Sequence, residues 1–161
     1  FRANGFEVER HDVSYGDQYL SIEARPRGRR AAVGPLPGEE TVQQVVDAAQ
    51  EFARQYARRT QHWRDELSRL TAEGPVILWG SGSKAVSFLK AVDVEGRVEH
   101  VVDVNPNRQG RYVACTGQRI LGPAEVPAVA PRAVIVMNTV YVTEIGASLR
   151  AAGVQTELLA L

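Results

Sequence analysis

The fold of this chain is decided by the stretch Val76-Ile77-Leu78-Trp79-Gly80-Ser81-Gly82-Ser83-Lys84-Ala85. Its first four residues are apolar without helical spacing, which is typical of a strand buried on both faces. Glycines then allow a sharp turn and a close approach of a ligand to the backbone. Helical spacing from Ser83 to Val92 and a second apolar run from Val98 to Asn105 complete a right-handed βαβ unit. Such a unit directs backbone N–H groups and a helix N-terminus at one crevice.

The same residues match part of the fingerprint of dinucleotide-binding proteins. That fingerprint reads G-x-G-x-x-G/A and is followed about 20 residues later by an acid that binds a ribose hydroxyl. Gly80, Gly82 and Ala85 fit the glycine pattern, and Asp103 lies at nearly the required distance. Many sheets of this class use the same turn only to pack a helix on a strand, so a purely structural role stays open beside a ligand site.

Composition excludes several classes of function. The chain has 161 residues, with 19 basic and 19 acidic side chains, so it offers no basic field for nucleic acid or an anionic membrane. No apolar run approaches the length of a membrane-spanning helix. A single cysteine, Cys115, excludes an internal disulfide and a cysteine-rich metal site, and it fits a cytoplasmic protein.

The chain before this unit divides into three predicted parts. Residues 1–26 alternate apolar and charged side chains around the turn Ser14-Tyr15-Gly16-Asp17, which predicts a β-hairpin. Because an isolated hairpin is marginal in water, we expect it to pack on another surface. Residues 27–40 are rich in arginine, glycine and proline and predict a linker. A helix is predicted from Thr41 to Ala72, about 48 Å long, which is enough to reach another domain or a dimer partner.

The chain after the unit predicts further α/β structure. A polar loop, a short irregular hairpin between Arg111 and Leu121, and a helical turn at Pro123 precede a buried strand from Ala133 to Met137. A helix over Tyr141–Ala152 and a strand over Val154–Leu161 follow. The whole pattern predicts a Rossmann-like, mostly parallel sheet with helices on both faces, so that residues 41–161 form one domain that includes the long helix.

Two stretches resemble a known family. The turn at Trp79–Ala85 and the D-x-N-P-x-x-Q-G-R run at Asp103–Arg111 are similar to the C-terminal domain of SAM-dependent C-methyltransferases, which include sugar C-methyltransferases. Met137-Asn138-Thr139-Val140-Tyr141 with Glu144-Ile145 fits the same pattern, as does the hairpin, which resembles the end of a preceding methyltransferase domain. One departure is Ala114-Cys115-Thr116-Gly117, where family members commonly have a Pro-Gly-Thr turn.

The resemblance implies a three-part enzyme, with a zinc-binding N-terminal module, a central SAM-binding domain and this domain. SAM, zinc and the catalytic base are then expected outside this chain, which by itself is not expected to catalyse. A nucleotide-linked sugar or similar acceptor is the expected ligand, and a homodimer is a possible assembly. The residues predicted to contact the substrate surround the crevice: Tyr15, Gly80, Ser81, Gly82, Ser83, Lys84, Asp103, Asn105, Arg108, Asn138 and Tyr141.

Two other functions stay open at this point. A Rossmann-type domain of an oxidoreductase would use the same crevice for NAD. A scaffold would bind no ligand by itself, and it would shape the active site or mediate dimerisation through the long helix. Titration with NAD and with a nucleotide-sugar distinguishes these functions from substrate binding.

Overall fold

The computed structural model describes residues 1–16, 18–28, 40–93 and 95–161. The chain forms two compact units, Phe1–Ala49 and Gln50–Leu161. Most of the predicted linker at residues 27–40 lies outside the described residues, and the predicted domain limits stay predictions.

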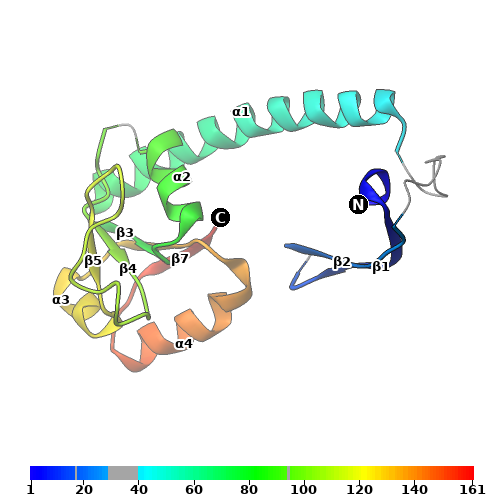
Figure 1. Ribbon diagram of the computed structural model, residues 1–161. Coiled ribbons are helices and arrows are strands. Elements are labelled where there is room, and N and C mark those ends of the chain that lie inside the picture. The colour runs from blue at the N-terminus through cyan, green and yellow to red at the C-terminus, as the bar shows by residue number, and fades with distance from the viewer. Residues whose placement is uncertain (17, 29–39, 94) are drawn as a thin grey trace. The chain divides into compact units, whose positions relative to one another are not determined.

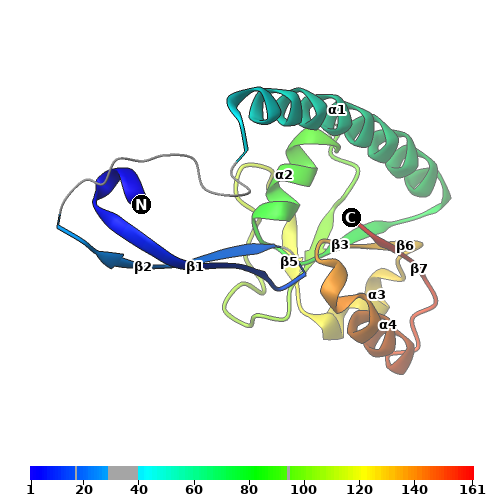
Figure 2. The ribbon, with the colours of Figure 1, turned by 90° about the vertical axis from the view of Figure 1, so that its right-hand side faces the viewer.

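The first unit contains the β-hairpin that the sequence predicts. Strands β1 (Phe6–Ser14) and β2 (Tyr19–Pro26) pair antiparallel, with Ser14 opposite Tyr19 at the turn (Figure 2). Tyr15 and Gly16, which follow Ser14, both adopt positive φ angles, of 56° and 61°. A short 3₁₀ turn at Arg2–Asn4, which was not predicted, precedes β1. Every described residue of this hairpin is at least partly exposed, so it has no core of its own.

The long helix α1 extends from Val42 to Glu73, within one residue of its predicted limits. Thr41 caps it: its hydroxyl accepts a hydrogen bond from the Gln44 N–H at 3.2 Å, and the Gln44 side chain accepts one from the Thr41 N–H at 2.8 Å. This reciprocal pair satisfies two N–H groups that a helix start leaves without partners. Gly74, at a φ of 153°, and Pro75 end the helix.

A five-stranded parallel sheet forms the centre of the second unit, in the order β5-β4-β3-β6-β7. Its strands are β3 (Val76–Trp79), β4 (His100–Val102), β5 (Arg119–Leu121), β6 (Ala133–Val136) and β7 (Glu157–Ala160). The predicted α/β fold is therefore confirmed. The predicted strand over Val98–Asn105 was too long, because the chain turns away after the Asp103 N–H donates to the Leu121 carbonyl.

Helices cover both faces of the sheet (Figure 1). Helix α2 (Ser83–Ala91) and the C-terminal half of α1 lie on one face, and α3 (Val126–Val129) and α4 (Val142–Ala151) lie on the other. Short 3₁₀ turns at Pro123–Glu125 and Thr139–Tyr141 lead into α3 and α4. Successive side chains of a strand point to opposite faces of the sheet, so each strand contributes to the hydrophobic cores on both faces. Leu78 packs with Trp63 and Phe88 on one face, whereas its neighbour Ile77 packs with Ile145 and Leu149 on the other.

The predicted hairpin between Arg111 and Leu121 is reduced to one antiparallel bridge, between Tyr112 and Arg119. Cys115 in this loop has a φ of 71°, a conformation that favours glycine. None of the helices that the structure describes has the length and apolar character needed to cross a membrane.

Candidate functional site

The candidate site lies where the strand order of the sheet reverses. Strands β4 and β5 follow β3 on one side, whereas β6 and β7 lie on its other side. The loops that leave β3 and β6 therefore diverge to opposite faces of the sheet, which opens a crevice at their carboxyl ends. Ligands of open α/β sheets bind in such crevices.

The turn after β3 depends on two glycines that have different roles. Gly80 has a φ of 110°, its N–H donates to the Val102 carbonyl at 2.7 Å, and a Cβ there would lie 3.4 Å from that of Met137. Gly80 is thus required by the backbone itself. Gly82, the N-cap of α2, has an ordinary φ of −78°, and a Cβ there would have no heavy atom within 4 Å. Its missing side chain therefore leaves open space in front of the helix N-terminus.

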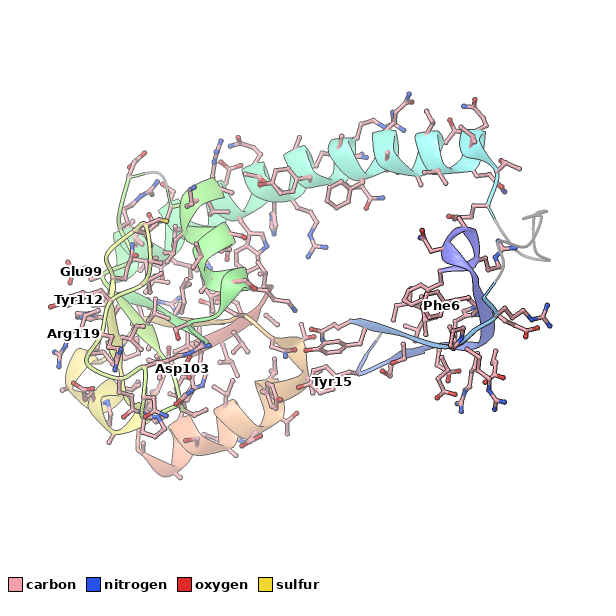
Figure 3. The ribbon with its side chains drawn as sticks, viewed as in Figure 1. Phe6, Tyr15, Glu99, Asp103, Tyr112 and Arg119 are labelled. Atoms are coloured by element: carbon pink, nitrogen blue, oxygen red, sulfur yellow. The ribbon has the colours of Figure 1, made fainter. Side chains whose placement is uncertain are left out.

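Asp103 joins the turn after β3 to the end of β4 (Figure 3). One carboxylate oxygen accepts hydrogen bonds from the Ser81 N–H at 3.0 Å, from the Ser81 hydroxyl and from Arg108 at 3.3 Å. The other oxygen accepts from the Asn105 N–H at 2.9 Å. Burial raises the pKa of this carboxyl, but these hydrogen bonds and the Arg108 charge outweigh it and hold the pKa below its usual value.

The D-x-N-P-x-x-Q-G-R run builds the loop after β4. Asn105 accepts a hydrogen bond from the Asn107 N–H at 3.0 Å, and the Gln109 amide donates to the Asp103 carbonyl at 3.0 Å. A Cβ on Gly122 would lie only 2.9 Å from the Gln109 side chain, so this glycine makes room for the glutamine. Gly110, at a φ of 75°, returns the chain to β5. The motif that carries the family resemblance is therefore used to shape this loop.

A cavity of about 340 Å³ opens beside these residues. Its walls come from the ends of β3, β4 and β6 and from the start of α4. Its apolar lining consists of Trp79, Val104, Val136, Met137 and Ile145, with Gly80 at the turn. Its polar lining consists of Asp103, Asn138, Tyr141 and Glu144. An apolar pocket with a few convergent polar groups is the usual form of a small-molecule site.

The structure brings four predicted site residues to this cavity: Gly80, Asp103, Asn138 and Tyr141. Ser81 and Arg108 bond to Asp103 at its edge, and Asn105 belongs to the adjoining loop. Gly82, Ser83 and Lys84 form the start of α2. Tyr15 belongs to the hairpin unit, and its contribution to the site stays a prediction.

Glu144 is a lining residue that sequence reasoning missed as a site residue. It lies in the first turn of α4, three residues after Tyr141, and is exposed. That spacing places two side chains on the same helical face, which was the available signal. Asn138 has a local role as well, since its side chain accepts the Val140 N–H at 3.3 Å and caps the following turn.

No group of three or more His, Cys, Asp or Glu residues in the described parts of the chain could hold a metal ion. The expectation of zinc concerns a module outside this chain and stays a prediction.

Sheet order, turn and cavity together define a Rossmann-like domain with a cavity at its switch point. The family described as C-methyltransferase C-terminal domain matches residues 19–157, so the chain belongs to that family. A comparison with curated proteins finds no match.

Proposed function

We propose that this chain is the substrate-side domain of a SAM-dependent C-methyltransferase and that its cavity holds the methyl acceptor. The observation that supports this most is the cavity at the switch point, which combines an apolar floor with Asn138, Tyr141 and Glu144. A sugar ring has apolar faces and hydroxyl edges, and it would find both kinds of partner there. A nucleotide-linked sugar is therefore the proposed ligand.

Charge divides the proposed site into two regions. Asp103 and Glu144 line the cavity, and their carboxylates disfavour a phosphate inside it. Phosphates would instead lie at the N-terminus of α2, in the space left by Gly82, with Arg108 beside them. Backbone N–H groups at a helix start and a guanidinium are common phosphate partners. The cavity would then receive the uncharged sugar.

Transfer of a methyl group to carbon requires a base that removes a proton beside a carbonyl. In this proposal SAM supplies the methyl group, and SAM and the base belong to another part of the polypeptide. The residues of this chain bind and orient the acceptor. A cytoplasmic location and a homodimer belong to the same proposal.

The geometry of Asp103 argues against NAD as the ligand. A dinucleotide site needs an acid that is open to a ribose hydroxyl. Asp103 is 8% exposed, and both of its oxygens already accept hydrogen bonds from Ser81, Asn105 and Arg108. Its role is therefore to position the turn after β3.

Calorimetric titration of residues 1–161 with thymidine-diphosphate-sugar, thymidine diphosphate, SAM and NAD tests the proposal. We expect saturation by the nucleotide-sugar and weaker binding of thymidine diphosphate. Tyr141→Phe and Glu144→Gln should each weaken nucleotide-sugar binding about tenfold, the cost of one hydrogen bond to a ligand, and leave thymidine diphosphate unaffected. Tyr112→Phe, a matched change at an exposed tyrosine outside the cavity lining, should alter neither.

The two turn glycines provide a second test. Gly82→Ala should fold normally and weaken both nucleotide ligands, because its methyl group would occupy the open space at the helix start. Gly80→Ala should instead lower stability, because of its φ of 110°. Saturation by NAD alone would refute the proposal. Absence of binding by every ligand would favour the scaffold.

A further inference from the structure

A second, larger cavity opens at the amino ends of the parallel strands, opposite the candidate site at their carboxyl ends. It has a volume of about 780 Å³ and lies where β3, β4 and β5 begin, between the end of α1 and α3. Its apolar walls include Val76, Ile77, Leu121 and Val129, and its charged lining consists of Arg97, Glu99, Arg119 and Glu125, together with His100. The candidate methyl-acceptor site uses the carboxyl ends of the strands, so the two cavities are separate.

Two of the charged residues in this cavity already satisfy each other. Arg119 donates to Glu125 at 3.1 Å, and the other oxygen of Glu125 accepts the Gly122 N–H at 2.8 Å. Glu125 therefore serves mainly as the cap of the turn that leads into α3. This pair forms a neutral part of the wall, and the other polar lining groups are Glu99, His100 and Arg97, whose ion-pair partner Glu95 is largely exposed.

These three groups have unmet bonding capacity. Glu99, labelled in Figure 3, is exposed. It makes no ion pair or hydrogen bond with any other described residue. The side chain of Arg97 is 25% exposed and forms an ion pair with Glu95 at 3.2 Å, but its buried Nε has no hydrogen-bond acceptor in the described part of the chain. The Nδ1 atom of His100 is buried and has no partner within the described part of the chain. Native structures rarely leave two neighbouring buried polar atoms, here Arg97 Nε and His100 Nδ1, without a hydrogen-bond partner.

The state of His100 follows from that buried nitrogen. An enclosed N–H without an acceptor is more costly than an enclosed lone pair, so the neutral ring places its proton on Nε2. His100 lines the cavity, and a ligand that reaches its Nε2 would find a hydrogen-bond donor there. The available groups are then two donors, Arg97 and His100, and one acceptor, Glu99.

We propose that this cavity binds a zwitterionic α-amino acid with an apolar side chain. Its carboxylate would accept hydrogen bonds from Arg97 and His100, and its ammonium group would donate to Glu99. Its side chain would lie on the apolar wall formed by Val76, Ile77, Leu121 and Val129. Beside the Arg119–Glu125 pair the lining carries one further charge of each sign, Arg97 and Glu99, which suits a ligand that carries both charges and no net charge.

Titration of the full chain by NMR with leucine, methionine and phenylalanine tests this proposal. We expect at least one of them to bind saturably, with shifts at Glu99, His100 and Ile77. Leucinol, which lacks the carboxylate, and 4-methylpentanoate, which lacks the ammonium group, should each bind about tenfold more weakly or worse. Long-range ¹H–¹⁵N spectra of His100 should show an Nε2–H tautomer whose Nε2 shift changes on binding.

The amino-acid affinities of variants inside and outside this cavity distinguish it from the candidate methyl-acceptor site. Arg97→Gln and Glu99→Gln should each weaken amino-acid binding about tenfold or more, because each removes a charged partner of the ligand. Arg111→Gln and Glu144→Gln make the same chemical changes outside this cavity and should leave the affinity unchanged. The proposal would be overturned if none of the three amino acids bound saturably. It would also be overturned if the Arg97→Gln and Glu99→Gln variants bound the amino acid as tightly as the parent chain does. Neither result bears on the methyl-acceptor cavity, whose ligands are titrated separately.

Discussion

The two halves of α1 have the same apolar spacing and opposite surroundings. Apolar residues recur every seven positions along the whole helix, at Val42, Ala49, Tyr56, Trp63 and Leu70. In the C-terminal half this stripe is buried against the sheet, where Leu67 and Leu70 are completely inaccessible. In the N-terminal half the large apolar side chains are exposed: Val42, Val45, Val46, Phe52 and Tyr56.

This difference shows that an amphipathic pattern indicates which face of a helix can be buried, and that the neighbouring structure decides whether it is buried. Trp63 is covered because Phe88 of α2 meets it edge-on, with ring centroids 5.6 Å apart. Among the described residues, the ring partner of Phe52 is Tyr56 of the same helix, with ring centroids 6.2 Å apart. Three pairs of variants test how far the two halves differ in energy.

The largest effect is expected from removing a buried side chain. Leu67→Ala should lower the free energy of unfolding by about 2–5 kcal/mol, because it creates a cavity between α1 and the sheet. Phe52→Ala should change it by no more than about 0.5 kcal/mol, since Phe52 is 71% exposed. Denaturant titration with a constant m-value measures both changes. A comparable loss in the two variants would mean that the exposed half is buried in solution.

An intermediate effect is expected where α1 is tied to α2. Arg64 donates through Nε and Nη2 to the carbonyl of Ala91, the last residue of α2, at 3.0 and 2.7 Å. Arg64→Ala should cost about 1–3 kcal/mol, because a helix-end carbonyl loses a charged, two-pronged donor. Arg54→Ala is the matched change in the exposed half, where the arginine pairs with Glu51 of the same helix, and it should cost less than about 0.5 kcal/mol. Equal costs would show that the bonds to Ala91 do not stabilise the native state.

The smallest effect is expected from pH. Hydrogen bonding to Arg132, which precedes β6, lowers the pKa of Glu73, and hydrogen bonds from Gln55 and Arg54 of the same helix lower that of Glu51. A carboxyl with a lowered folded-state pKa stabilises the native state at neutral pH. That contribution is lost as the pH falls through the folded-state pKa.

The comparison of Glu73→Gln with Glu51→Gln checks this expectation. Glu73→Gln should lower stability slightly at neutral pH, and the difference from the parent chain should vanish in acid. Glu51→Gln should have the same sign and a smaller size, because its partners are local and persist in a partly unfolded helix. Free energies of unfolding at several pH values provide the measurement. A larger effect at Glu51 would contradict the contrast between the two halves.

The candidate site was only partly predictable, for reasons that individual residues make clear. Gly80 and Asp103 could be identified because a glycine turn and an acid at that spacing follow from the βαβ unit. Sequence could not show that Asp103 uses its oxygens to bind Ser81, Asn105 and Arg108, since those hydrogen bonds depend on the loop after β4. Glu144 was missed because an exposed acid in a first helical turn is more often a surface residue.

The sequence by itself determined the class of the sheet, the limits of α1 to within one residue and the strands of the sheet other than β5, where it predicted an irregular hairpin. These features arise from short-range periodicity and turn chemistry, which act between residues close along the chain. Only the tertiary structure decided the burial of Trp63 and the formation of the two cavities. One is lined by residues as distant in sequence as Trp79 and Tyr141, and the other by residues such as Arg97 and Val129. Each of these depends on distant segments meeting across the sheet, where the packing of one element sets the environment of another.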